Sequence, residues 1–416
     1  MACSDLVGSG AYTYYTQKSR PDPGFRPSYH NLLLEAGITN KVVNKYKNRQ
    51  YEKECSSVEI TIEKATNPRP KPNASALNFG TVFTDHMFIW DYTIEKGWHN
   101  PRIIPYGPLE MDPACIVFHY GQAVFEGMKA YRGPEGEVLL FRPEQNMARL
   151  NRSNERLSIP LFDESCALEA IKKLVALDRD WIPSEPGTAL YIRPFIIATD
   201  NYLGVRPSHT YKFIVILSPV GSYYEEGLNP VSIYVEPDYV RAIRGGTGFA
   251  KAAGNYAGSL LAQVNAQAKG YAQVLWLDGI ERRYVEEVGT MNVFFNIGGR
   301  LITPDLSGSI LPGVTRDSIL QLLRSWRVPA EERRLRIEEI FQAHDEGKLI
   351  EAFGCGTAAV VSPIGKLGYN NRVIEIGGGK AGELTQRLYD TLTGIQTGRL
   401  PDPFGWVVKV AVKRLS

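Results

Sequence analysis

The sequence predicts a mixed α/β protein (α+β), with a smaller amino-terminal domain and a larger carboxy-terminal domain built on a barrel-like β core. The chain has 416 residues, of which 44% are hydrophobic, and this is enough for two domains that each have a core. From Ser57 onward, short runs of β-branched and aromatic residues alternate with stretches that have helical apolar spacing. The later strand-like runs are short and separated, which favours a barrel-like sheet over a doubly wound one.

Changes in composition divide the chain into four segments. Residues 1–56 are expected to form an amino-terminal extension, because they lack a sustained hydrophobic period and contain three prolines within Ser19–Pro27. A small α/β domain (57–200), an interdomain linker (201–211) and a large ligand-binding domain (212–416) are expected to follow.

The first domain is predicted to contain strands followed by two helices. The helix Pro143–Leu157 begins with proline, which is favoured in a first turn, and the helix Asp163–Trp181 begins with an N-cap candidate. Strands are predicted at Val58–Ala65, Asp85–Tyr92, Cys115–Gly121 and Glu137–Pro143.

A strand within Leu190–Val205 is predicted to lead into the linker. The second domain is then predicted to be mixed, with helical spacing at Leu260, Leu261 and Val264 and again at Ile319, Leu320 and Leu323. Its strands are predicted at Lys212–Val220, Val231–Pro237, Ala272–Asp278 and Val293–Pro304, the last of which contains a Gly-Gly turn.

Charge and cysteine content exclude several classes of function. With 47 basic and 45 acidic residues the chain is nearly neutral and has no basic stripe, so no nucleic-acid partner is expected. No apolar run approaches the roughly 20 residues that cross a bilayer, so no membrane partner is expected. The five cysteines are scattered without a Cys-x-x-Cys pair, which predicts buried free thiols and no metal site. We expect a cytoplasmic protein, and mitochondrial import stays open.

One lysine stands in an unusual setting, in the run GGTGFAKAAGNYAGS (Gly245–Ser259). Glycines let the backbone approach a ligand closely, and small apolar neighbours favour the neutral amine that a Schiff-base lysine needs. Lys251 is therefore a candidate for binding the carbonyl of pyridoxal phosphate, whose ring acts as an electron sink. A lysine in a mobile loop is the alternative.

A pyridoxal phosphate site also needs an acid for the ring nitrogen and a phenol near the lysine. Glu286 and Glu287 are adjacent candidates for the acid, and only one can face the site, because neighbours in a strand point to opposite faces. Tyr256 could hydrogen-bond the phenolic oxygen of the ring. The alternatives are a solvated pair of glutamates and a core tyrosine.

Two further segments could bind anions. In LPGVTRDSILQLL (Leu311–Leu323), Gly313 permits close approach at a helix start, where the amides of Val314 and Thr315 and the Thr315 hydroxyl can bind phosphate. In GCGTAAVV (Gly354–Val361), the amides of Thr357 and Ala358 could bind a second anion, such as a substrate carboxylate. A capped helix and a glycine-rich bend are the alternatives.

Taken in order, these motifs resemble those of the branched-chain amino-acid aminotransferases, which belong to the fold-type IV group of pyridoxal phosphate enzymes. The resemblance runs from about Ala76 to about Pro363. It rests on FGTVFTDHM, HYGQAVFEGMKAYRG, FRPEQNMARLNRS, YIRP, GGTGFAK, EEVGTMNVFF, ILPGVTR and GCGTAA.

The resemblance implies a role for each matching position. Lys251 matches the Schiff-base lysine and general base, Glu287 the partner of the pyridine nitrogen, and Arg149 an arginine that binds phosphate. The remaining cofactor contacts match Tyr256, Val314, Thr315 and Thr357, with Arg241 as a further neighbour of the cofactor.

The resemblance also implies an apolar substrate pocket and a homodimer. Arg193 matches the arginine that binds the side-chain carboxylate of glutamate, Ala358 belongs to the turn that binds the α-carboxylate, and Val205 matches a residue supplied by the partner subunit. The pocket lining matches Phe79, Tyr120, Phe125, Tyr191, Thr290 and Met291. The implied reaction transfers the amino group of leucine, isoleucine or valine to 2-oxoglutarate.

Four alternative functions fit the sequence less well. A D-amino-acid transaminase or an aminodeoxychorismate lyase would share the lysine and the glutamate, but FEGMKAYRG and YIRP favour the branched-chain group. A dinucleotide-binding module would need a G-x-G-x-x-G between a strand and a helix, and none is present. A non-catalytic binding protein would not need Lys251.

Overall fold

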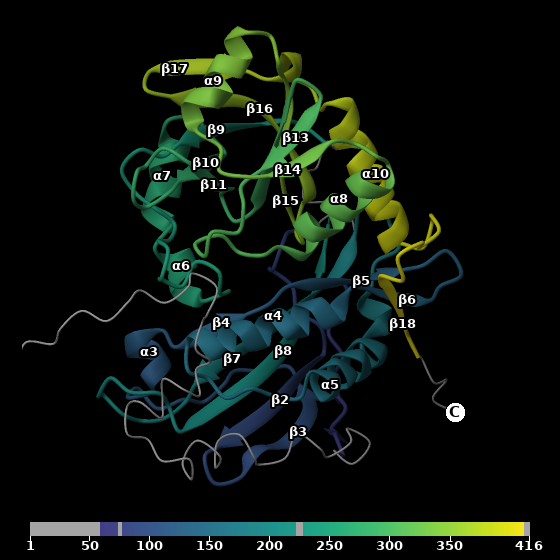
Figure 1. Cartoon of the computed structure of the whole chain (residues 1–416). Helices are drawn as coiled ribbons and strands as arrows, with labels where there is room; N and C mark the ends of the chain where they lie inside the picture. The colour runs from purple at the N-terminus through teal and green to yellow at the C-terminus, as the bar shows by residue number, and fades with distance from the viewer. Residues whose placement is uncertain (1–58, 74–76, 222–227, 412–416) are drawn as a thin grey trace, which may run out of the picture. The chain divides into compact units, whose positions relative to one another are not determined.

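A computed structural model describes residues 59–73, 77–221 and 228–411. The described residues belong to one compact unit, residues 55–416. Two sheets of nine strands each form its framework (Figure 1). The prediction of a mixed α/β fold is confirmed, and the barrel-like core of the second half has the form of a half-barrel. The expected extension, residues 1–56, lies outside the described residues.

The first sheet is antiparallel except for the parallel pair β1 and β3. Strand β4 (Ala123–Phe125) pairs with β7 beside the main path. Along that path the strands are β1 (Thr61–Ile62), β3 (Gly97–Pro105), β2 (His86–Thr93), β8 (Thr210–Val220), β7 (Ala189–Ala198), β5 (Met128–Arg132), β6 (Val138–Phe141) and β18 (Val407–Val410).

The second sheet is mixed, with parallel pairs at β9–β10, β9–β16 and β13–β14. Strand β17 (Arg372–Glu375) pairs with β16 beside the main path. Along that path the strands are β11 (Val285–Val288), β10 (Gln273–Leu277), β9 (Val231–Val235), β16 (Val360–Tyr369), β15 (Leu349–Gly356), β12 (Asn292–Ile297), β13 (Arg300–Thr303) and β14 (Ala330–Glu332).

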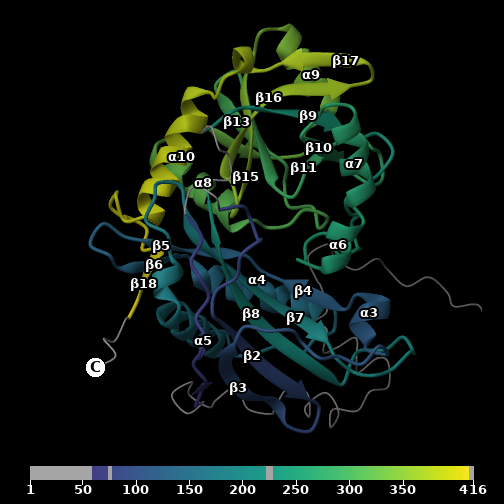
Figure 2. The same ribbon diagram turned by 180° about the vertical axis from the view of Figure 1, so that it is seen from behind.

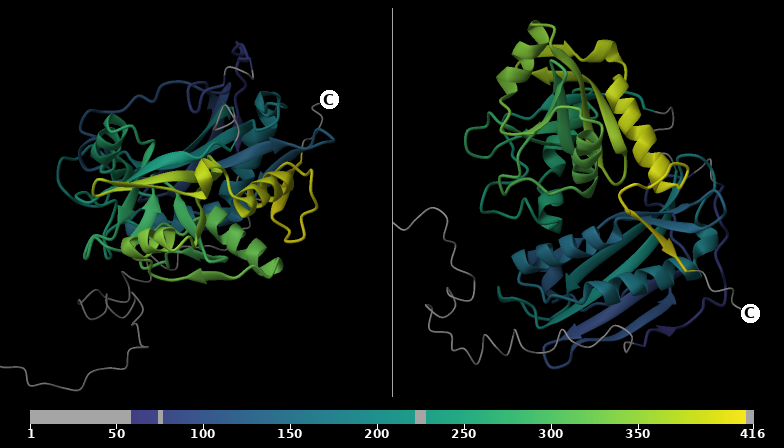
Figure 3. Two further views of the ribbon diagram at one scale, coloured as in Figure 1. Left: turned by 90° about the horizontal axis from the view of Figure 1, so that it is seen from above. Right: turned by 45° about the vertical axis from the view of Figure 1, so that its right-hand side comes forward.

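Helices cover both sheets. Figures 1 and 2 show α4 and α5 along the first sheet and α7 beside β10, and the right-hand view of Figure 3 shows α10 running from the second sheet toward β6 and β18. The helices are α3 (Ile116–Tyr120), α4 (Pro143–Arg156), α5 (Glu164–Leu177), η3 (Arg179–Trp181), α6 (Ala253–Ala257), α7 (Leu260–Ala268), α8 (Val314–Ser325), α9 (Ile337–Asp345), η4 (Gly377–Gly379) and α10 (Glu383–Gln396).

Local sequence signals explain several of these elements. Asp163 caps α5 by accepting a hydrogen bond from the Cys166 amide at 2.9 Å, and proline occupies the first turn of α4, as predicted. The turn between β12 and β13 requires positive φ at Gly298 and Gly299, which have φ values of 60° and 82°.

Two sequence-based expectations are corrected by the structure. Cys115–Gly121 was expected to be a strand, but Ile116–Tyr120 forms the short helix α3, which ends at Gly121 in the left-handed region with φ 57°. A short apolar run does not distinguish a strand from a helix, and the left-handed C-cap glycine favours the helix.

The second correction concerns the point along the chain at which the first sheet ends and the second begins. The strand Lys212–Val220 was expected to open the large domain, but it lies within β8, which pairs with β2 and β7 in the first sheet. The carboxy-terminal strand β18 also returns to the first sheet, where it pairs with β6. The division into a small and a large domain with a linker at 201–211 stays a prediction.

Apolar side chains of the described residues form three large cores, one of which lies between the second sheet and α9. Another core lies between the first sheet and helices α4 and α5. The third joins α8 and α10 of the second half to Leu139 of β6, Phe141 of β6 and Tyr191 of β7. This third core contains residues of both sheets, and it packs β6 and β7 against the middle and the last turns of α8.

Three of the five cysteines confirm the prediction of buried free thiols. Cys115, Cys166 and Cys355 are buried free thiols, whereas Cys3 and Cys55 lie outside the described residues. None of the helices in the described ranges is both long enough and apolar enough to span a lipid bilayer.

A buried polar pair supports the first sheet and yields a test of its stability. His86 at the start of β2 is 7% exposed and Asp178 is 3% exposed, and His86 Nδ1 lies 2.6 Å from Asp178 Oδ1. The Ala65 amide donates to His86 Nε2 at 2.9 Å, which places the imidazole proton on Nδ1.

We expect His86→Ala to lower the free energy of unfolding by about 3 kcal/mol, because it leaves the buried carboxylate of Asp178 without its side-chain donor. Urea unfolding followed by circular dichroism measures this change, with the partly exposed His344→Ala as the matched control. A loss below about 1 kcal/mol would show that the pair contributes no more than an average hydrogen bond.

Candidate active site

Lys251 lies where the lysine segment meets the first sheet. Its backbone amide donates to Ser153 Oγ at 2.9 Å, and its carbonyl accepts from the Phe125 amide at 3.1 Å. Helix α4 supplies Ser153 and strand β4 supplies Phe125. Two elements of the first half of the unit, α4 and β4, therefore hold the backbone at Lys251. These contacts argue against the alternative of a lysine in a mobile loop.

The Lys251 amine faces two aromatic rings and one hydroxyl. Tyr256 lies one turn later in α6, and Lys251 Nζ donates to its hydroxyl at 2.8 Å. The amine also lies 4.8 Å from the centre of the Phe125 ring. Among the described residues no carboxylate forms an ion pair with this amine.

Arg149 is held by a glutamate that the sequence interpretation missed. Glu126 follows β4 and is fully buried, and it accepts from Arg149 Nε at 2.7 Å and from Nη2 at 2.9 Å. Asn146 donates to the same carboxylate at 2.9 Å. Burial raises the pKa of Glu126, but the charge and hydrogen bonds of Arg149 outweigh burial and lower it below its ordinary value.

Arg149 also reaches the segment that begins α8. Its Nη1 donates to the Pro312 carbonyl at 3.2 Å, one residue before the N-cap Gly313. No side chain caps this helix, so the amides of Val314 and Thr315 in its first turn have no side-chain acceptor. A guanidinium beside an uncapped helix start is an arrangement that binds a phosphate.

The structure separates the two adjacent glutamates. Glu287 accepts from the Leu311 amide at 2.7 Å and lies 3.2 Å from Arg241 Nη2, whereas Glu286 contacts Ser309. Burial raises the pKa of Glu287, while Arg241, the Leu311 amide and the charges of Lys251 and Arg149 oppose that rise. Because the charges of Lys251 and Arg149 act on Glu287, this carboxyl group lies near the candidate site.

The turn after β15 is braced by a second residue that was missed. Lys129 of β5 is buried, and its Nζ donates to the Ala358 carbonyl at 2.6 Å. Burial lowers the pKa of Lys129 to about 8. Thr357 precedes Ala358 in this turn, so a buried cation without a carboxylate partner among the described residues lies beside the predicted anion-binding amides.

Aromatic residues and one arginine form a connected wall. The rings of Phe79 and Tyr191 meet edge to face at 4.8 Å, and Arg193 Nη2 donates to the Tyr191 hydroxyl at 3.0 Å. The Arg193 guanidinium also lies 4.8 Å from the centre of the Phe125 ring. Gly127 is required here, because a Cβ at this position would lie 2.0 Å from the Tyr191 hydroxyl oxygen.

Four predicted pocket residues do not join this cluster in the described part of the chain. Tyr120 is exposed and donates to the Leu203 carbonyl, and Val205 is 85% exposed. Thr290 lies in the exposed turn before β12, and the partly buried Met291 packs against Gly354 and Gly356 of β15.

Glu126 and Lys129 carried a signal in the sequence that could have been used. Both lie in AVFEGMKAY, where a glutamate and a lysine interrupt an otherwise apolar run. Charged residues within a buried strand are expected to be paired or functional. Their partners lie 23 and 229 residues away along the chain, so no local spacing identifies them.

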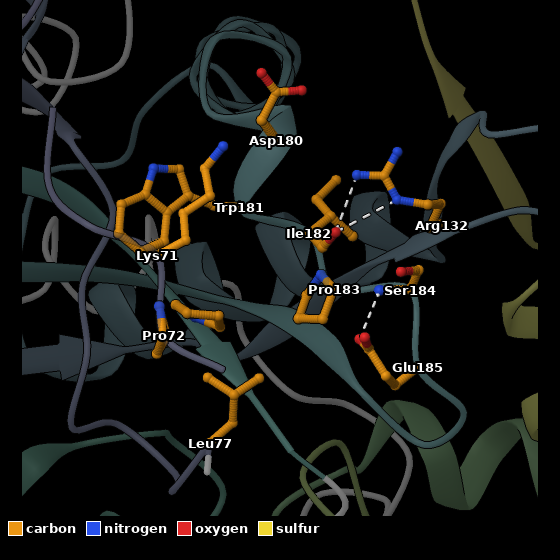
Figure 4. Close-up of a pocket in the computed structure, with 11 residues that line it drawn as sticks. Lys71, Pro72, Leu77, Arg132, Asp180, Trp181, Ile182, Pro183, Ser184 and Glu185 are labelled. Carbon is orange, nitrogen blue, oxygen red and sulfur yellow. Dashed lines mark hydrogen bonds between the residues drawn. The ribbon is translucent and has the colours of Figure 1, made fainter. Parts of the chain in front are cut away.

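A separate cavity of about 460 Å³ lies away from these residues (Figure 4). It is lined by Lys71, Leu77, Arg132 and the segment 180–185, and Arg132 donates to the Ile182 carbonyl. None of the predicted site residues lines it. Within the described ranges, no group of three His, Cys, Asp or Glu side chains is arranged to hold a metal ion.

Comparisons with known proteins agree with this geometry. Residues 123–367 match the family model for amino-transferase class IV. The chain is 59% identical over 352 residues to branched-chain-amino-acid aminotransferase 2 of Bacillus subtilis, a match that covers 85% of this chain and 97% of that protein.

Solved structures with the same fold come from the same group. The branched-chain amino acid aminotransferase of Escherichia coli has a TM-score of 0.67 and 28% identity, covering 78% of this chain and 99% of that one. The enzyme of Thermobaculum terrenum in its PLP-form has a TM-score of 0.63 and 28% identity, covering 78% and 98%. The chain therefore belongs to the class IV aminotransferase family, and within it to the branched-chain-amino-acid aminotransferases.

Proposed function

We propose that this protein is a pyridoxal phosphate enzyme that transfers the amino group of L-leucine, L-isoleucine or L-valine to 2-oxoglutarate. The products are the branched-chain 2-oxo acids and L-glutamate. The observation that carries the proposal is the position of Lys251, whose amine meets the Tyr256 hydroxyl next to the Glu126–Arg149 pair. The family to which the chain belongs supports the same reaction.

The residues present fit pyridoxal phosphate. The start of α8 has no side-chain cap, and the buried Arg149 lies beside it, so a phosphate finds a cation and free amides together. Arg149, Val314, Thr315 and Thr357 would hold the phosphate, while Tyr256, Glu287 and Arg241 would surround the ring. When bound, the cofactor supplies a carbonyl for the amine and an electron sink for the substrate.

Lys251 would act as the general base of the reaction. Its neutral Nζ would take the proton from the α-carbon of the substrate and deliver it to the cofactor carbon that carried the carbonyl, within the same half-reaction, and the second half-reaction would move a proton in the opposite direction. The hydrogen bond to Tyr256 fixes the position of Nζ, and the Phe125 ring excludes water from one side of the amine. Because both contacts come from packed elements, the base is positioned before the substrate arrives.

Glu287 would hold a proton shared with the ring nitrogen of the cofactor. A carboxyl whose pKa is raised by burial binds such a proton strongly. The Leu311 amide and Arg241 fix the carboxylate from one side. Arg241 therefore acts chiefly through Glu287.

The substrate carboxylate would bind at the turn that contains Thr357 and Ala358. Their amides supply hydrogen-bond donors, and Lys129 orients the turn through the Ala358 carbonyl and adds a positive charge. Tyr191 lies on the neighbouring strand and pairs with Lys129 in the register of β5 and β7. An anionic group is thus favoured at this end of the site.

The side-chain pocket would accept both apolar and acidic substrates. Its aromatic wall suits a branched aliphatic side chain, while the Arg193 Nε is buried without a partner among the described residues. An unsatisfied guanidinium nitrogen in an aromatic wall can bind the distal carboxylate of glutamate. Phe79, Tyr120, Thr290 and Met291 complete the proposed lining.

A homodimer is part of this proposal. Val205 is 85% exposed, and Phe118, Leu203 and Leu260 are other exposed apolar residues. Val205 and Leu203 lie in one exposed segment, and the Tyr120 hydroxyl donates to the Leu203 carbonyl, so this segment is the surface that we expect the partner to contact. The proposed role of Val205 is to line the active site of the partner subunit. The cytoplasmic location stays a prediction.

Replacing the lysine tests the reaction. We expect Lys251→Ala to lower the rate of glutamate formation from L-leucine and 2-oxoglutarate by at least about 10³-fold, because the base and the anchoring amine are both lost. Borohydride reduction followed by mass spectrometry should attach the cofactor to the wild-type protein only. The exposed Lys348→Ala serves as the control, and a variant at Lys251 that retains the rate would contradict the assignment.

Lys129 gives a prediction that depends on pH. Because burial lowers its pKa to about 8, the side chain is charged below that pH and neutral above it. The KM for L-leucine should therefore rise as the pH increases through about 8, and Lys129→Met should have a KM raised about tenfold at neutral pH with little further change.

The exposed Lys366→Met is the matched control for Lys129 and should retain the wild-type pH profile. A KM for Lys129→Met that equals the wild-type value at neutral pH would show that Lys129 has no part in substrate binding. Steady-state kinetics between about pH 6 and 9 separate KM from kcat.

A further inference from the structure

Glu286 is a buried acid that the proposed reaction does not use. It lies on β11 next to Glu287, is 4% exposed, and points to the opposite face of the strand. Its Oε1 contacts the Ser309 hydroxyl, and its Oε2 is buried without a hydrogen-bond partner in the described part of the chain. A carboxylate in this setting would be strongly destabilised.

Three charged groups act on Glu286 electrostatically. They are Arg241, Glu287 and Asp278. Asp278 is already satisfied by backbone amides, including those of Glu281 and Tyr284 at 2.8 Å each. Arg241 is therefore the one cation among these groups, and it lies 3.2 Å from Glu287.

Arg241 cannot serve both glutamates equally. Its Nη2 donates to the Gly248 carbonyl at 2.9 Å and to the Ser309 carbonyl, as well as facing Glu287. Lys251 and Arg149 also act on Glu287, whereas Arg241 is the one cation among the groups that act on Glu286. Two ionised glutamates would therefore compete for the Arg241 guanidinium in a buried cluster. Burial raises the pKa of Glu286 to about 7, against the opposing effects of Ser309 and Arg241.

A protonated Glu286 completes a hydrogen-bond chain. Its carboxyl proton can be donated to Ser309 Oγ, which lies 3.1 Å from Ser307 Oγ and can pass its own hydroxyl proton to that atom. The orphan Oε2 is then a carbonyl oxygen rather than half of a carboxylate, which lowers the cost of burying it.

Ser309 connects Glu286 to the candidate phosphate site. Two residues later the Leu311 amide donates to Glu287, and α8 begins at Val314. The segment Ser309–Leu311 is thus held by Glu286 and Glu287 from the two faces of β11, with Arg241 bound to the Ser309 carbonyl.

We propose that Glu286 is a positioning residue kept as a neutral carboxylic acid, which braces Ser309–Leu311 and leaves Arg241 to Glu287. The link to cofactor binding rests on the proposed role of Glu287, but the protonation state of Glu286 does not. Ionisation of Glu286 introduces a second anion that competes for Arg241 and loosens the segment before α8.

The protonation state is tested on the protein without cofactor. The infrared difference spectrum between wild type and Glu286→Gln should contain the carbonyl band of a protonated carboxylic acid at about pH 5.5, and the band should disappear by about pH 8.5. Absence of the band at the lower pH would overturn the proposal.

Thermal unfolding of the same apoprotein gives a second test, and its sign follows from the raised pKa. Stability from the Glu286 proton is present in full below the unfolded pKa of about 4.5 and is lost as the pH rises through the folded value of about 7. The wild type should therefore lose several degrees of Tm relative to Glu286→Gln between about pH 5 and 8. If the Tm values of the wild type and Glu286→Gln change with pH in parallel, the proposal is overturned.

The exposed Glu110→Gln is the matched control and should follow the wild-type profile. The link to the site is tested by the dissociation constant of pyridoxal phosphate. The ratio of the wild-type value to that of Glu286→Gln should rise about threefold or more between about pH 6 and 8.5. A constant ratio, with the infrared band present, would overturn the link to Glu287 while leaving the proposed transamination intact.

Discussion

The buried ion pair between Glu126 and Arg149 is the interaction on which the site depends. It joins the strand that carries Phe125 to helix α4, and Arg149 extends from α4 to the Pro312 carbonyl at the start of α8. Removing Glu126 would leave a buried guanidinium without its counter-ion, which costs several kcal/mol in proteins. The position of Arg149 relative to α8 is thus set by a residue that does not itself reach α8.

Around this pair the buried charges favour anionic ligands. Lys251 and Lys129 have no carboxylate partner among the described residues, while Glu126 is committed to Arg149. The excess of positive charge lies near the start of α8 at one end and the turn of Ala358 at the other. Two positively charged ends with an aromatic wall between them suit the cofactor phosphate and the substrate carboxylate of the proposed reaction.

The sequence predicted the parts of the fold that local chemistry determines. Asp163 and Pro143 identified the starts of α5 and α4. Because side chains alternate between the two faces of a strand, Glu286 and Glu287 were expected to point in opposite directions, and both lie in β11. The helix Ile116–Tyr120 was mistaken for a strand because a short apolar run has no distinguishing period. The roles of Glu126 and Lys129, and the sheet to which β8 belongs, depend on long-range pairing that one sequence does not reveal.

The dissociation constant of pyridoxal phosphate for the apoprotein of Glu126→Gln tests the central claim most directly. If Glu126 positions Arg149, affinity should fall about tenfold or more, although the variant carries one negative charge fewer near the phosphate. If charge alone governs binding, the same substitution should strengthen it. A dissociation constant equal to or below the wild-type value, with the fold intact by circular dichroism, would contradict the account.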